Sequence, residues 1–161
     1  LISDAALSQN VAQYRHFWGL RERMSEAQSH AGKNIKHDIS IPISRIPQFV
    51  RSTDAAIVSA YPDARMIVFG HLGDGNLHYN VSPLRGQRGE SFAEIEAPIN
   101  RLTHDAVAAF GGSVSAEHGL GVLRRVEAAR YKSGVELALM RAIKTALDPQ
   151  GIMNPGKSLP L

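Results

Sequence analysis

The chain has 161 residues and a net charge of +3, with 43% hydrophobic and 20% charged residues. This balance predicts a folded domain with a buried core and excludes a disordered tail, and no apolar run is long enough to cross a membrane. Because the chain has no cysteine, disulfides, thiol nucleophiles, iron–sulfur clusters and cysteine-based zinc sites are excluded. Any metal site must therefore use histidine, carboxylate or backbone oxygen ligands.

The charge is unevenly distributed along the chain. Residues 71–123 hold three basic and six acidic side chains, whereas residues 124–161 hold seven basic and three acidic ones. The acidic middle suits a cation and the basic end suits an anion. Without a dense Lys/Arg run or many aromatic residues, nucleic-acid binding is a minor alternative, and it would show as strongly salt-dependent association.

Two helices and one strand are predicted in the first part of the chain. Apolar residues at helical spacing predict a helix over residues 9–30. Alternating apolar and polar residues predict a strand over residues 36–43. Pro47 stands at a favourable first-turn position of the next helix, which Pro62 ends. The apolar side of the strand is formed by Ile39, Ile41 and Ile43.

A hairpin is predicted next. The continuous apolar run 66–70 predicts a buried strand, and residues 76–81 predict a second strand. Asp74 and Gly75 lie between the two strands and form a strong signal for a tight turn.

The last part of the chain is predicted to be mainly helical. Apolar spacing indicates a helix over residues 90–110, in which His104 is expected to be partly exposed. A short strand is predicted over residues 113–116. Residues 124–147 are predicted to be helical, with an interruption near Ser133.

The order of these elements predicts an α+β fold. After the opening helix the chain reads β-α-β-β-α-β, which is the ferredoxin-like arrangement of an antiparallel sheet with helices packed on one face. Extra helices are expected at the N- and C-terminal ends. Neither common glycine-rich phosphate-binding motif is present in the sequence, so no nucleotide-binding loop of those types is expected.

Two histidines flank the predicted turn at a spacing that suggests a metal site. If Asp74 and Gly75 are the two loop residues, His71 and His78 are direct cross-strand neighbours with Cβ atoms about 4.5–5.5 Å apart, close enough to bind one ion. Asn80 lies on the same face as His78. A register slip of one residue would separate the histidines. The alternative is a pair of histidines that merely flank a turn.

A second cluster completes the candidate site. A catalytic metal needs about three protein ligands and an open position. If the predicted strand 113–116 lies beside the hairpin, Glu117 supplies an oxygen ligand, and His118 is either a fourth ligand or a general base. The alternative is a solvated turn in which the neighbouring glycines serve only the backbone.

Three ordered motifs resemble one family. The motifs are HLGDGNLH at 71–78, EHGLG at 117–121 and DPQGIMNPGK at 148–157. Together they resemble the C-terminal substrate domain of FAD-linked D-2-hydroxyacid dehydrogenases, the group of D-lactate dehydrogenases, the glycolate oxidase subunit and D-2-hydroxyglutarate dehydrogenases. The resemblance implies that residues 1–161 form a single C-terminal substrate-binding domain of a larger flavoenzyme, and that the N-terminal FAD-binding domain is absent from this chain.

The resemblance also implies roles for particular residues. It implies that His71, His78 and Glu117 bind a divalent metal, with zinc favoured, and that His118 is the catalytic base. Residues expected to contact the substrate are Arg21, Ser25, Lys36 and Asn80. The resemblance further implies that Asn154 approaches the flavin of FAD.

The implied activity is the oxidation of a D-2-hydroxy acid to the 2-oxo acid, with the isolated domain inactive. The expected partners are the small 2-hydroxy acid and the FAD-binding domain of the same protein, without nucleic acid, in a cytoplasmic, bacterial-type location. The choice among lactate, malate, 2-hydroxyglutarate and glycolate stays open, as does a homodimer. The alternative function is a metal- or carboxylate-binding module without redox activity.

Overall fold

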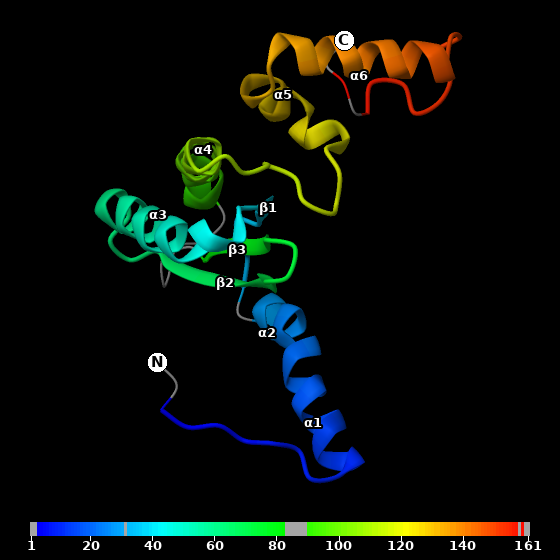
Figure 1. The fold of residues 1–161 in the computed structure, drawn as a ribbon. Helices are drawn as coiled ribbons and strands as arrows, with labels where there is room; N and C mark the ends of the chain where they lie inside the picture. The colour runs from blue at the N-terminus through cyan, green and yellow to red at the C-terminus, as the bar shows by residue number, and fades with distance from the viewer. Residues whose placement is uncertain (1–2, 31, 83–89, 158, 160–161) are drawn as a thin grey trace. The chain divides into compact units, whose positions relative to one another are not determined.

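The computed structural model describes residues 3–30, 32–82, 90–157 and 159 (Figure 1). The chain divides into two compact units, Leu1–Asn34 and Ile35–Leu161. Each unit is described by itself below. Within the described ranges, no helix combines the length and the apolar character needed to span a membrane.

The first unit contains the predicted N-terminal helix in two pieces, α1 (Val11–Glu22) and α2 (Met24–His30). Asn10 caps α1, because its side chain accepts a hydrogen bond from the Gln13 amide at 2.9 Å. Such a cap satisfies one of the free N–H groups at a helix start. Gly32, with φ +116°, follows the end of α2, and the prediction of helix over this region is confirmed.

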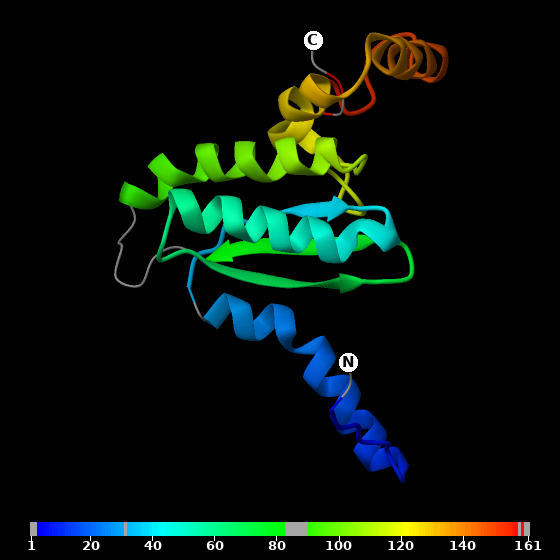
Figure 2. The same ribbon diagram turned by 60° about the vertical axis from the view of Figure 1, so that its left-hand side comes forward.

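The second unit is built on a three-stranded antiparallel sheet in the order β1-β3-β2. The strands are β1 (Asp38–Ser40), β2 (Arg65–His71) and β3 (Asn76–Ser82). Helices α3 (Ile46–Ala60) and α4 (Glu90–Ala109) cover one face of this sheet (Figure 2). The predicted α+β class is therefore confirmed.

The core lies between the sheet and these two helices. Tyr79 on β3 packs edge-on against Phe49 of α3, with ring centroids 5.6 Å apart. Both side chains are fully buried, and burial of such large apolar surfaces is the main stabilising contribution to a fold of this kind. Other fully or nearly fully buried members are Ile35, Ile39, Ile41, Ile57, Val81, Ile99 and Val107.

The predicted fourth strand is wrong in extent. Instead of a strand over residues 113–116, Ser113 forms a single antiparallel bridge with Ser40, beside β1. Two carbonyls of this segment accept from side chains instead, that of Ser115 from the Ser113 hydroxyl and that of Val114 from Arg124, while the Ala116 amide donates to the Asp38 carbonyl of β1 at 3.1 Å. The segment still occupies the edge that a fourth strand would take.

Two further expectations about burial are corrected. The strand predicted at 66–70 to be buried is the edge strand β2, which is only partly buried because just one neighbour pairs with it. Ile43 is 48% exposed, whereas Ile39 and Ile41 are buried as predicted. The strand ends at Ser40, and Ile43 begins a 3₁₀ turn, η1 (Ile43–Arg45), so the alternation does not reach it.

The hairpin has a longer loop than predicted. His71 pairs with Asn76, so residues 72–75 form a four-residue loop and the histidines are not direct partners. Asp74 stabilises this loop, since its carboxylate accepts a hydrogen bond from the Asn76 amide at 3.0 Å. The Gly75 carbonyl accepts a hydrogen bond from the Ile41 amide at 3.0 Å, which ties the loop to the end of β1.

The C-terminal region contains two helices separated where the sequence predicts an interruption. These are α5 (Gly121–Tyr131) and α6 (Gly134–Leu147). Ser133 starts α6 with a capping box: its hydroxyl accepts from the Glu136 amide, and the Glu136 carboxylate accepts from the Ser133 amide. This reciprocal arrangement explains why the second helix begins at this point.

We expect Gly75→Ala to destabilise the second unit. Gly75 has φ +77°, and an added Cβ would lie 2.3 Å from the Ile41 carbonyl oxygen. Left-handed strain of this kind costs about 1–3 kcal/mol, to which the steric conflict adds. Urea unfolding followed by circular dichroism measures the change. Gly73→Ala is the matched control in the same loop, because no atom lies within 4 Å of its added Cβ; equal destabilisation by both variants would contradict the role of Gly75.

Candidate metal and substrate site

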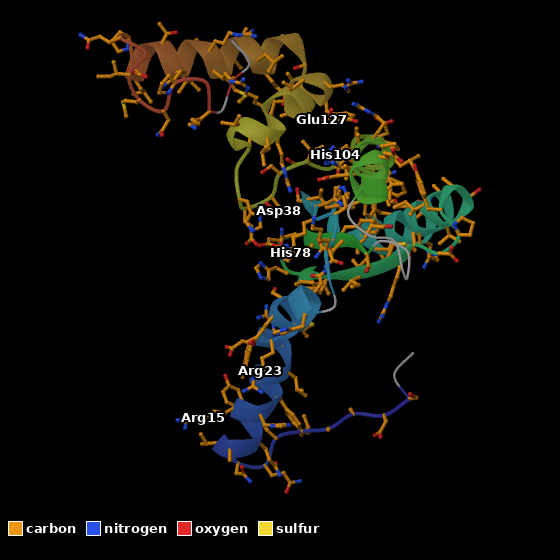
Figure 3. The ribbon with its side chains drawn as sticks, turned by 180° about the vertical axis from the view of Figure 1, so that it is seen from behind. Arg15, Arg23, Asp38, His78, His104 and Glu127 are labelled. Carbon is orange, nitrogen blue, oxygen red and sulfur yellow. The ribbon has the colours of Figure 1, made fainter. Side chains whose placement is uncertain are left out.

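The candidate site lies on the sheet face turned away from α3 and α4. Side chains alternate along β3, so Asn76, His78 and Asn80 share the face opposite Tyr79, which packs on the helices. On the neighbouring strand β1, Asp38 is the direct partner of His78. Figure 3 shows these two side chains next to each other.

Asp38 connects this face to the segment that carries Glu117 and His118. One carboxylate oxygen, Oδ2, accepts hydrogen bonds from the backbone amides of Glu117 at 3.0 Å and His118 at 2.8 Å. The other oxygen, Oδ1, accepts from the Asn76 side-chain amide at 2.8 Å. The residue is only 2% exposed. A buried carboxylate with this many donors is a strong local constraint on the backbone that donates to it.

The same hydrogen bonds determine the ionisation of Asp38. Burial by itself would raise the pKa of Asp38, but the amide hydrogen bonds from His118 and Glu117 outweigh it and hold the pKa below its ordinary value. The carboxylate is therefore negatively charged at neutral pH.

Glu117 lies between the two histidines of the hairpin. Its Oε1 is 3.2 Å from His78 Nε2 and its Oε2 is 3.9 Å from His71 Nδ1. The two imidazole rings are nearly perpendicular, with centroids 6.3 Å apart. The three residues predicted as metal ligands thus converge, although the histidines come together diagonally rather than as direct cross-strand partners.

His118 lies at the edge of this cluster. Its Nδ1 is 3.6 Å from Asp38 Oδ2 and its Nε2 is 3.6 Å from Glu117 Oε1. Its side chain is 62% exposed, so it is accessible from solvent. An imidazole next to a buried negative charge is well placed to accept a proton, because the carboxylate stabilises the cation that forms.

Two nitrogens and one carboxylate are a donor set suited to a divalent transition metal. Asp38, His78, Glu117 and His118 each offer one ligand atom, and these atoms lie within 4.8 Å of one another. Both oxygens of Asp38 are already engaged by three protein donors. The donors that remain in this group are those of His78, Glu117 and His118, and His71 lies beside it with its Nδ1 3.9 Å from the Glu117 carboxylate. Glu117 with two of these histidines gives a two-histidine, one-carboxylate set, which is typical of catalytic zinc.

The sequence-based reasoning missed two residues that hold this site together. One is Asp38, which stands at a polar position of the alternating pattern over residues 36–43, so the sequence gives no local signal that it is buried. The other is Arg124, whose guanidinium donates to the carbonyl oxygens of Lys36 at 3.1 Å, Val114 at 3.3 Å and Asp38 at 3.4 Å. No motif in the sequence distinguishes Arg124 from the other basic residues of α5.

The other predicted site residues are placed as follows. The side-chain oxygen of Asn80 accepts a hydrogen bond from the His37 amide at 3.3 Å, and Asn80 is buried on the same sheet face as His78. Lys36 is exposed two residues before Asp38. Asn154 has φ +47° and lies in the loop after α6. Arg21 and Ser25 belong to the first unit, and their contacts with a substrate stay predictions.

A second polar cluster lies on the helix-covered side of the sheet. His37 is buried, its Nδ1 is 2.7 Å from the Tyr79 carbonyl oxygen, and its ring is perpendicular to that of His104 at 5.4 Å. His104 Nδ1 is in turn 3.2 Å from the carboxylate of Glu127 on α5. Figure 3 shows the last two side chains together. His104 is 4% exposed, so the expectation that it is partly exposed is wrong; Glu127 provides the partner that makes its burial tolerable.

Comparison with known proteins identifies the class of this domain. Residues 1–158 match the family of FAD linked oxidases, C-terminal domain, and the chain belongs to this family.

The chain is similar to D-2-hydroxyglutarate dehydrogenases. It is 40% identical over 157 residues to that of Stutzerimonas stutzeri (strain A1501), 38% over 160 residues to the mitochondrial one of Arabidopsis thaliana and 35% over 160 residues to the mitochondrial one of Danio rerio. The alignments cover 97%, 99% and 99% of this chain but 33%, 27% and 29% of these relatives. The chain therefore spans about a third or less of the length of the curated relatives it matches.

We expect the stability of the second unit to fall as the pH is lowered from 7 to 4.5. Burial lowers the pKa of His37 from 6.5 to about 4, so between these values the unfolded chain binds a proton that the folded chain does not. Acidification therefore favours unfolding by up to about 3 kcal/mol through this residue. Urea unfolding at the two pH values, with His37→Gln beside the parent, measures the contribution.

His16→Gln, which changes an exposed histidine of α1, is the matched control for this experiment. The His37 variant should lose much of the dependence on pH, whereas the control should retain it. If the stability of the parent and of both variants changed equally with pH, His37 would not be a source of acid sensitivity.

Proposed function

We propose that this chain forms the substrate- and metal-binding half of an FAD-dependent dehydrogenase that oxidises a D-2-hydroxy acid to the 2-oxo acid. The observation that carries the proposal is the convergence of His71, His78 and Glu117 beside His118 and the buried Asp38 carboxylate. The relatives are named D-2-hydroxyglutarate dehydrogenases, which makes D-2-hydroxyglutarate the first substrate to test. Residues 1–161 would act as one substrate-binding domain, with FAD held by an FAD-binding domain of the same protein.

The metal in this proposal is divalent, with zinc favoured, and His71, His78 and Glu117 would hold it. When bound, it supplies a positive charge that lowers the cost of developing negative charge on a hydroxyl oxygen. The side chains of His71 and Glu117 are both exposed, so the cluster is open on one side. A metal site that also accepts a substrate requires such an opening. FAD, when bound, supplies the acceptor for the hydride.

His118 is the proposed base. If its Nδ1 carries the proton and faces Asp38, the lone pair on Nε2 is free to accept the hydroxyl proton of the substrate. The charged Asp38 then stabilises the imidazolium that forms, and it also holds the ring by binding the backbone amide of the same residue. The solvent exposure of His118 gives the proton a route out of the site.

The carboxylate end of the substrate requires separate anchors. Arg21 can bind a carboxylate through two parallel hydrogen bonds, and Lys36 can contribute a point charge. Ser25 and Asn80 would add hydrogen bonds, and Asn154 would approach the flavin. A cytoplasmic location and a homodimer stay predictions from the sequence.

We expect Glu117→Ala to abolish zinc binding. The variant removes the carboxylate that lies between His71 and His78, and two histidines alone leave the site one ligand short. Elemental analysis after incubation with zinc and dialysis should give about one zinc per chain for the parent. Glu96→Ala on the exposed surface of α4 is the control and should retain the metal. A parent chain that binds no zinc, manganese or iron would overturn the metal assignment.

We expect His118→Asn to lower turnover about 10²–10⁴-fold, the usual contribution of general acid–base catalysis. The measurement is kcat with D-2-hydroxyglutarate and a dye acceptor, in a protein that joins this chain to the FAD-binding portion of the Stutzerimonas stutzeri relative. His16→Asn should leave kcat unchanged. Unchanged turnover in the His118 variant would exclude this residue as the base, and activity of the 161-residue chain alone would contradict the need for an FAD-binding domain.

A further inference from the structure

The segment before Glu117 contains one residue more than the strand that it accompanies. Ser40 and Ser113 exchange two backbone hydrogen bonds, of 3.0 and 2.9 Å. The next backbone hydrogen bond joins the Ala116 amide to the Asp38 carbonyl at 3.1 Å. The step along β1 is therefore two residues, whereas the step along the other segment is three. This mismatch is that of a β-bulge, which often redirects side chains next to functional sites.

The extra residue determines where the two site residues that follow it lie. In a regular ladder the Ser115 amide would reach the Asp38 carbonyl. The insertion thus moves Glu117 and His118 by one position, about 3.3 Å along the strand. Glu117 Oε1 is 3.2 Å from His78 Nε2, and a shift of that size would separate these two atoms. The candidate site therefore requires that the bulge keep its shape.

The guanidinium of Arg124 replaces the ladder hydrogen bonds that the bulge interrupts. It donates to the Val114 carbonyl at 3.3 Å on the bulged segment, and to the carbonyls of Lys36 at 3.1 Å and Asp38 at 3.4 Å on the other side. The His37 carbonyl accepts from β3, so the carbonyls on either side of it point to the opposite edge. Within the described part of the chain, all hydrogen bonds of this guanidinium go to backbone carbonyls, which need donors where water is excluded.

Helix α5 is also held by contacts that do not involve Arg124. The Glu127 carboxylate accepts a hydrogen bond from Arg101 on α4 at 2.8 Å. The Tyr131 hydroxyl donates to Asp105, also on α4, at 2.7 Å. Both contacts lie in the C-terminal half of α5, whereas Arg124 lies in its first turn. The helix therefore provides a fixed base from which Arg124 reaches the bulge.

We propose that Arg124 is a positioning residue of the candidate site, because its guanidinium holds the bulge at Val114 against β1 and thereby sets the positions of Glu117 and His118. The inference rests on the proposed function, in which these two residues are a metal ligand and the base. Arg124 acts only through the backbone in this role and contacts neither metal nor substrate. A side chain with several donors should preserve the role in part, and an apolar side chain should not.

Amide hydrogen exchange of the metal-free 161-residue chain tests the proposal directly. Arg124→Met keeps an unbranched side chain but removes every donor, and Arg124→Lys retains three donors on one nitrogen. Arg130→Met is the matched control, because it removes the same charge from an exposed position of α5. Exchange followed by NMR gives the rate at individual amides.

We expect Arg124→Met to raise the exchange rates of the Ala116, Glu117 and His118 amides at least about tenfold, because the segment that donates these hydrogen bonds can then leave β1. The amides of the β2–β3 ladder should keep their rates. Arg124→Lys should give a smaller increase, and the control none. Unchanged rates at residues 116–118 would overturn the proposal. An equal rise across the ladder, or an Arg124→Met variant that does not fold, would also overturn it, because either result shows a contribution to the whole fold rather than to the site.

Turnover of the protein that joins this chain to the FAD-binding portion of the Stutzerimonas stutzeri relative gives a second measurement. Arg124→Met should lower kcat with D-2-hydroxyglutarate about 10- to 100-fold, since a small displacement of a catalytic group has an effect of this size. Arg124→Lys should recover most of the loss, and Arg130→Met should leave kcat unchanged. Unchanged kcat in Arg124→Met would exclude a positioning role in the reaction.

The two measurements separate this inference from the proposed function. Hydrogen exchange requires neither metal nor FAD nor substrate, so its result stands whatever reaction the enzyme catalyses. Local release of residues 116–118 in Arg124→Met, together with an unmodified joined protein that does not oxidise D-2-hydroxyglutarate, would count against the proposed reaction but support the role of Arg124 in holding the site. Activity of the unmodified joined protein without local release in the variant would count against the role of Arg124 alone.

Discussion

The geometry of the candidate site depends on one buried carboxylate. Asp38 accepts hydrogen bonds from the amides of Glu117 and His118, which are separated from it by more than 75 residues in sequence, and from the side chain of Asn76. The predicted strand before this segment is reduced to a single bridge at Ser113 and one further backbone hydrogen bond, from the Ala116 amide to the Asp38 carbonyl at 3.1 Å. The Asp38 carboxylate extends these contacts to residues 117 and 118, and so brings the proposed base and the proposed carboxylate ligand to the histidines.

The hairpin shows why a wrong register still placed His71 and His78 on one face of the sheet. A two-residue loop would make His71 and His78 direct partners, whereas the four-residue loop shifts the pairing so that His71 faces Asn76. Both loops contain an even number of residues, and side chains alternate with a period of two along a strand. The two histidines therefore fall on the same sheet face in either case, and an odd-numbered loop would have separated them.

The buried histidines illustrate the opposite situation. Helical spacing places His104 on α4 but does not reveal that Glu127, from a later helix, supplies its partner. Likewise, nothing near His37 in sequence indicates the Tyr79 carbonyl that its ring contacts. Polar residues are buried where other segments supply their hydrogen-bond partners, and these segments can be distant in sequence. Local patterns therefore predict more exposure for such residues than the structure shows. Helix α6 shows the reverse case, because its apolar residues Val135, Leu139, Ile143 and Leu147 are 59% to 75% exposed among the described residues.

By itself, the sequence determined the element types, the α+β class, the break before α6 and the three motifs that carry the family resemblance, because periodicity, capping residues and turn residues act over a few positions. It also limited the side chains that the proposed metal site can use to histidine and carboxylate, since the chain has no cysteine. Only the tertiary structure decided the hairpin register, the edge position of β2, the roles of Asp38 and Arg124 and the burial of His37 and His104. Each of these depends on hydrogen bonds or packing between segments far apart in the chain, and such contacts leave no local pattern to read.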